Sequence, residues 1–101
     1  VDNFIVGCRG IVPALENADN FIRIYKYIQN EKFGNAHKEY MKILPSIVFI
    51  MQSINSLVCY GKRICAYRMG VKNIYDRSPG MIPTSYGIKK AKRISEDLGF
   101  F

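Results

Sequence analysis

One short apolar run sets the strictest limit on how this chain can fold. The run Ile11–Leu15 lies between Gly10 and the polar pair Glu16 and Asn17, and its length predicts a single buried β-strand. Pro13 has no backbone N–H, which weakens the hydrogen-bond ladder of a central strand. No second strand is predicted elsewhere, so the backbone groups of this one have no partner within the chain. The pattern therefore indicates that a neighbouring segment lies outside these 101 residues.

Two helices are predicted in the first half of the sequence. Apolar side chains recur at helical spacing after a capping residue at Asp19 or Asn20, and a second helix follows a short polar break. No charged residue occurs in the 19 residues from 43 to 61, which is close to the length of a membrane span. Because Pro45 and several polar residues interrupt this stretch, we expect a buried helix that breaks near residues 53–55 and no membrane span.

Two further helices are predicted in the second half. One runs from about residue 56 to residue 69 and ends at Gly70, because glycine is a common helix stop. The other begins after a cap at Thr84 or Ser85 and ends at Gly99. The residues alone thus predict an α-rich chain with one strand and about four helices.

The positive charge is concentrated in the second half. The chain has 15 basic and 8 acidic residues, and nine of the basic but only three of the acidic residues follow residue 56. The densest basic cluster is Lys89, Lys90, Lys92 and Arg93. Such a stripe can bind phosphates. No helix-turn-helix, RNA-binding aromatic pair or zinc finger accompanies it, so a solvated helix face is the preferred interpretation and nucleic acid is not an expected partner.

The cysteines and the single histidine predict neither a disulfide framework nor a metal site. Cys8, Cys59 and Cys65 form no C-x-x-C pair, and nothing in the sequence places His37 beside a thiol. Reduced thiols and the lack of a leader peptide indicate a cytoplasmic protein. There is also no glycine-rich phosphate loop and no pair of catalytic carboxylates. No metal or cofactor is therefore expected.

Three motifs, taken in order, do resemble a known family. The first is Gly7–Asn17, which is similar to Gly-x-x-Gly followed by a strand and an asparagine. The second is Ala36–Pro45, with an amphipathic turn before Ile-Leu-Pro. The third combines Met69–Val71 with Arg77–Pro79 and Pro83. Over nearly its whole length the chain resembles the C-terminal third of the pyruvate-dependent class I aldolases, such as dihydrodipicolinate synthase, N-acetylneuraminate lyase and 2-keto-3-deoxygluconate aldolase.

The resemblance implies an α-rich segment of a (β/α)8 TIM barrel. Residues 1–30 would be the last barrel strand and helix, and residues 31–101 the C-terminal helical extension. It would also explain the single strand, because the other seven strands of a barrel would lie upstream. The stretch 55–60 lacks the Asn-Pro-x-Pro that the family often has there, and Pro13 is unusual within the strand. These departures leave a 2-keto-3-deoxy sugar acid aldolase open beside a dihydrodipicolinate synthase.

The resemblance further implies a lyase that forms a Schiff base with pyruvate or a pyruvate-derived keto acid. It places the catalytic lysine and tyrosine upstream of Val1, so no residue of this chain is expected to be catalytic and the chain alone is expected to be inactive. The expected partners are the upstream barrel segment and further copies in a homo-tetramer. The alternative is a non-catalytic helical binding module that uses the basic last helix.

Within this chain the resemblance implies only contributions to the wall of the substrate pocket. Barrel active sites lie at the C-terminal ends of the strands, and the penultimate helix of the family approaches the same mouth. The expected wall residues are Ala14, Leu15, Glu16, Asn17, Asn55, Ser56 and Tyr60.

Overall fold

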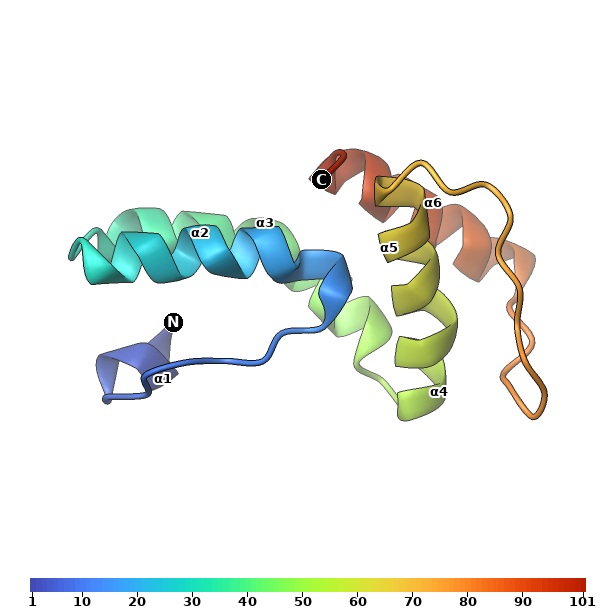
Figure 1. Ribbon diagram of the computed structural model, residues 1–101, viewed down its shortest axis with the longest axis horizontal. Coiled ribbons are helices and arrows are strands. Elements are labelled where there is room, and N and C mark those ends of the chain that lie inside the picture. The colour runs from blue at the N-terminus through green and yellow to red at the C-terminus, as the bar shows by residue number, and fades with distance from the viewer.

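The computed structural model describes residues 1–101 and contains only helices and the segments that connect them (Figure 1). The molecule measures 43 × 24 × 18 Å along its principal axes. The helices are α1 (Asp2–Ile5), the 3-10 turn η1 (Leu15–Asn17), α2 (Ala18–Gln29), α3 (Phe33–Ile50), α4 (Ile54–Ser56), the π-helical segment η2 (Leu57–Gly61), α5 (Lys62–Arg68) and α6 (Ser85–Leu98).

The prediction of a strand at Ile11–Leu15 is wrong. Residues 9–13 are extended but make no backbone hydrogen bond, and Leu15 already belongs to η1. A strand needs a neighbouring strand to pair its N–H and C=O groups, and this chain provides only helices. The expected fold class, one strand and about four helices at the end of a TIM barrel, is therefore corrected to an all-helical chain.

The first layer of the fold is the hairpin of α2 and α3, which lie side by side in Figure 1. Ile24 of α2 and Ala36 and Ile43 of α3 form its buried core. Helix α2 begins at Ala18, and neither Asp19 nor Asn20 caps it as predicted. The carboxylate of Asp19 is instead bound by Arg23, one turn further along α2, and by Arg68, which the local sequence does not reveal.

The second layer is formed by the helix Ile54–Arg68, which comprises α4, η2 and α5, together with α6. Its buried core contains Ile50 from the end of α3 and the side chains of Cys59, Tyr60, Ile64, Ala91 and Ile94. Helix α3 thus contributes to both cores, and its C-terminal end connects the two layers.

The predicted break after the second helix is confirmed. Helix α3 passes through Pro45 and ends at Ile50, and Ser53 then caps the next helix by accepting a hydrogen bond from the N–H of Ser56 at 3.0 Å. The two helices are bent by 111° relative to each other. No single helix is long and apolar enough to cross a membrane, although this bent pair reaches that length and composition when taken together.

The limits of the last helix also match the prediction. Thr84 caps α6, because its Oγ1 accepts a hydrogen bond from the N–H of Gly87 at 3.0 Å. The helix ends at Gly99, whose φ of 78° lies in the left-handed region that favours glycine. Local capping chemistry is sufficient to set both ends.

Candidate functional site

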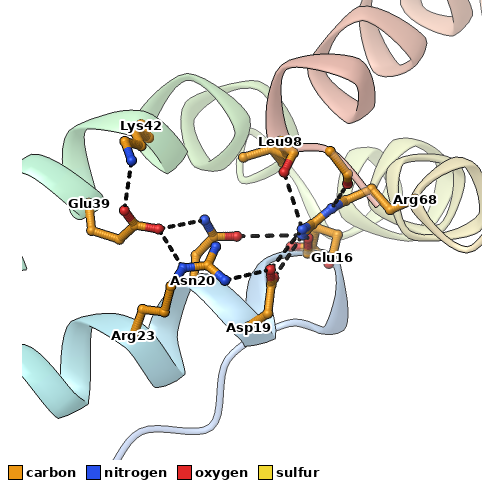
Figure 2. Close-up of polar contacts among 9 residues, drawn as sticks. Glu16, Asp19, Asn20, Arg23, Glu39, Lys42, Arg68 and Leu98 are labelled. Carbon is orange, nitrogen blue, oxygen red and sulfur yellow. Dashed lines mark hydrogen bonds and ion pairs between the residues drawn. The ribbon is translucent and has the colours of Figure 1, made fainter. Parts of the chain in front are cut away.

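The most elaborate polar site in the fold surrounds Arg68, the last residue of α5 (Figure 2). Its side chain is 0% exposed. The guanidinium donates to both carboxylate oxygens of Asp19, at 2.9 Å and 2.8 Å, and to the backbone carbonyl of Glu16 at 2.6 Å. Nε donates to the carbonyl of Gly99 at 2.7 Å, and the ring of Phe101 stacks on the guanidinium with 4.2 Å from its centroid to Cζ. One arginine therefore joins the start of α2, the end of α5 and the C-terminal tail.

A chain of ion pairs continues from this arginine along α2 and α3. Arg23 donates to Asp19 at 3.1 Å and to Glu39 at 2.8 Å, and Glu39 also accepts from Asn20 at 3.1 Å and from Lys42 at 3.0 Å. Burial raises the pKa of Asp19, but Arg68 and Arg23 outweigh it and hold the pKa below its usual range. Burial likewise opposes ionisation of Glu39, and its bonds to Arg23, Lys42 and Asn20 lower its pKa. Both carboxylates are therefore compensated anions.

Glu16 differs from these acids because no cation meets its carboxylate. The residue is 4% exposed and takes part in no ion pair. Its one side-chain hydrogen bond is a long one of 3.5 Å from Nδ2 of Asn17, which also donates to Ser46 at 3.3 Å. Burial raises the pKa of the Glu16 carboxyl, and its own backbone N–H offsets this only in part. Oδ1 of Asn17 is buried and has no donor.

The glycine of the π-helical segment faces the carboxylate of Glu16. A Cβ on Gly61 would make an ordinary van der Waals contact of 3.6 Å with Oε2 of Glu16 and a tight one of 3.2 Å with Cδ1 of Leu57. A π-helical turn widens the helix locally and is often found at functional sites. Glu16 and this turn therefore form a close contact between segments that are 45 residues apart in the sequence.

The seven residues expected in the pocket wall do not form one surface. Glu16 and Asn17 are buried beside Gly61, and the hydroxyl of Ser56 donates to the carbonyl of Phe49 at 3.4 Å. Leu15 and Asn55 are exposed, and Ala14 is half-buried. Asn55 lines a groove of about 520 Å³ that also contains Lys62 and the loop from Tyr75 to Met81.

The hydroxyl of Tyr60 is hydrogen-bonded to Thr84 at the start of α6. It accepts a hydrogen bond from the N–H of Thr84 at 3.1 Å and lies 3.3 Å from the Thr84 hydroxyl. The ring is buried and also lies against Phe49, with 5.1 Å between the ring centroids. Tyr60 therefore fixes the N-terminus of α6.

The Arg68 site could not be recognised from sequence spacing. Arg68 and Asp19 are 49 residues apart, and nothing near either residue indicates that they meet. No group of three or more His, Cys, Asp or Glu side chains is placed to hold a metal ion. These buried polar residues hold the helices against one another, and Glu16 is the one acid among them that has no ion-pair partner.

A groove of about 440 Å³ runs between the extended segment and α2. Gly10, Ile11 and Pro13 line one side, and Phe21 and Tyr25 line the other. Beyond the groove, Val12 is 99% exposed. Half of the residues that line this groove are hydrophobic, and Arg9 and Lys26 also line it.

Comparisons of this chain with protein-family models, with curated proteins and with solved structures find no match.

Proposed function

We propose that this chain is the C-terminal portion of a Schiff-base, pyruvate-dependent aldolase or lyase of the dihydrodipicolinate synthase type, with a 2-keto-3-deoxy sugar acid aldolase as the other possible subfamily. The order of the motifs at Gly7–Asn17, Ala36–Pro45 and Met69–Pro83 supports this assignment. An upstream segment of the same protein is the proposed partner, and it would carry the reacting lysine.

The exposed segment formed by residues 9–15 gives the strongest structural support for the proposal. Residues 9–13 leave their backbone N–H and C=O groups without backbone partners, and Ile11, Val12 and Leu15 are largely exposed although they are apolar. Exposed apolar side chains are unfavourable on a free surface, and the exposed backbone groups, which water solvates in this chain, are available to pair with a segment that packs there. This is the face on which the resemblance puts the rest of the enzyme.

The chemistry requires a lysine that this chain does not supply in suitable surroundings. In a Schiff-base lyase the neutral lysine amine attacks the keto carbon, water leaves, and the resulting iminium accepts the electron pair of the neighbouring C–C bond. Such a lysine is desolvated so that it can be neutral, whereas none of the nine lysines here is buried. We therefore assign the reacting lysine to the upstream segment. The iminium supplies the electron sink, so the mechanism needs no cofactor.

Trapping with borohydride tests this assignment. The complete protein is treated with pyruvate and sodium borohydride, which reduces a Schiff base to a stable amine, and intact masses are then measured. We expect one pyruvate-derived adduct on the complete protein and none on the isolated 101-residue chain. Lactate replaces pyruvate in the control, because it has no keto group.

Two outcomes would overturn the proposal. One is the absence of an adduct on a complete protein that is shown to be folded. The other is an adduct on the isolated chain, which would place a reacting lysine among the exposed or half-buried lysines described here.

A non-catalytic binding module is the second candidate function. Lys89, Lys92 and Arg93 are exposed on α6, and none of the six ion pairs in the structure involves them. Binding of duplex DNA that weakens steeply with salt would favour this module. The enzyme proposal expects no such binding, and it also expects a cytoplasmic homo-tetramer.

A further inference from the structure

Helix α3 carries an apolar stripe that neither core of the fold uses. Met41, Val48 and Met51 are 50%, 59% and 61% exposed, and the half-buried Leu44 packs against neither core. Their order along the sequence, with separations of three, four and three residues, places them on one side of the helix. Single exposed apolar residues are common on protein surfaces, whereas a contiguous strip of them indicates a docking surface. These four residues are called the α3 stripe below.

The α3 stripe is separate from the face at which the upstream segment is proposed to pack. The groove at that face is lined by residues of the extended segment and of α2, and by no residue of α3. Helix α3 contributes Ala36 and Ile43 to the core that it shares with α2, and these residues lie on a different side of the helix from the stripe. A segment that fills the groove therefore leaves the α3 stripe open.

The spacing of the α3 stripe is the same in both directions along the helix. When two copies of α3 lie antiparallel, Met41 of one copy falls opposite Met51 of the other. In the same register, Leu44 of one copy falls opposite Val48 of the other. Such a reciprocal contact is the isologous interface of a two-fold dimer, and alternating separations of three and four residues suit the packing of two nearly aligned helices. The stripe is therefore complementary to itself.

The distribution of charge on α3 also favours an antiparallel pair of copies. The exposed charged side chains of this helix are Lys38 and Lys42, and residues 43–50 carry no charge. A parallel pair would bring each lysine beside the same lysine of the other copy, which is unfavourable. An antiparallel pair places the lysines against the uncharged half of the other helix, and it also sets the two helix dipoles in opposite directions.

We propose that the α3 stripe is a self-association surface, at which two copies of this chain pair their α3 helices antiparallel about a two-fold axis near residue 46. The proposal rests on the exposure, spacing and charge of α3 and does not depend on the proposed enzyme function, which borohydride trapping tests separately. A helix of this length extends over ~27 Å, and one pair of such helices makes a small interface. We therefore expect a dimer that dissociates on dilution.

Sedimentation equilibrium measures this pairing. Concentrations from about 1 μM to about 1 mM cover the dissociation constants of weak complexes, and the wild-type chain should shift from monomer to dimer over this range. Val48→Lys places two charges in the apolar seam of each dimer and should raise the dissociation constant by about tenfold or more. Ile22→Lys is the matched control, because Ile22 is 56% exposed on α2, and it should leave the constant unchanged. Circular dichroism checks that both variants fold.

A pair of introduced cysteines tests the direction of the two helices. The variant is Met41→Cys/Met51→Cys, made together with Cys8→Ser because Cys8 is exposed. Within one chain the two positions are ~15 Å apart along the helix, whereas the Cα atoms of a disulfide lie about 4.4–6.8 Å apart. A disulfide between positions 41 and 51 therefore joins two copies. We expect this link after mild oxidation, in the 101-residue chain and in the complete protein, with peptide mass spectrometry to identify it.

Several results would overturn the proposal. They are a wild-type chain that remains monomeric at the highest concentration, a dimer that Val48→Lys leaves intact, and disulfides that join only equal positions of the two copies. A link that forms in the isolated chain but not in the complete protein would show that an upstream segment covers the stripe, which also contradicts the proposal. If Val48→Lys does not fold, NMR of the wild-type chain decides, because amide shifts that change with concentration should be confined to residues around 41–51.

Discussion

Arg68→Met is expected to lower the free energy of unfolding by about 3 kcal/mol or more, since removing one partner of a buried ion pair costs about 3–5 kcal/mol. Methionine keeps much of the length of arginine but donates no hydrogen bond. The variant therefore leaves Asp19 without its bidentate partner and leaves the carbonyls of Glu16 and Gly99 without a donor. Urea unfolding measures the loss.

Two matched variants show whether the effect belongs to the site. Arg93→Met makes the same change at an exposed position of α6 and should stay within about 0.5 kcal/mol of the wild type. Arg68→Lys keeps the charge but loses the planar fork, so its loss should be intermediate. Equal stabilities for Arg68→Met and Arg93→Met would show that the buried arginine does not hold the layers together.

Gly87→Ala is expected to destabilise the chain by about 1–3 kcal/mol, the usual range for overpacking a core. The same change in an open helix stabilises it by about 1 kcal/mol, because alanine is the better helix former. Here a Cβ on Gly87 would lie 2.2 Å from the hydroxyl oxygen of Tyr60 and 2.3 Å from its Cζ. Tyr60 cannot easily move away, because its hydroxyl is bound to Thr84.

Repeating Gly87→Ala in the Tyr60→Leu variant shows whether its effect comes from the contact with Tyr60 or from helix propensity. In Tyr60→Leu the atoms that the new Cβ would meet are absent, so Gly87→Ala should become neutral or stabilising. Gly34→Ala, in the first turn of α3 with nothing near its Cβ position, should stabilise the chain. Thermal unfolding of the five proteins provides the comparison. An equal cost for Gly87→Ala in both backgrounds would contradict the contact with Tyr60.

Helix ends were predictable from the sequence where the determining chemistry is local. Thr84 caps α6 through an N–H three residues away, and Ser53 does the same for the helix that follows the break. Gly99 ends α6 by its own left-handed backbone. Each of these features depends on a few neighbouring residues, which the sequence displays directly.

Features that depend on distant partners were missed or misplaced. The run Ile11–Leu15 has the composition of a strand, but no second strand is present to pair with it. Asp19 resembles a helix cap, yet it binds Arg68, which is 49 residues away. The contacts of Ser56 with Phe49 and of Tyr60 with Thr84 likewise arise from packing that the sequence spacing does not encode.

Hydrogen exchange at residues 9–14 tests most directly whether this face is where the rest of an enzyme packs. In the isolated chain the N–H groups of these residues donate no backbone hydrogen bond, and the side chain of Val12 is fully exposed. We expect them to exchange at the rate of an unprotected peptide in the 101-residue chain and to be strongly protected in the complete protein. Equally fast exchange in both proteins would contradict the proposal that an upstream segment covers this face.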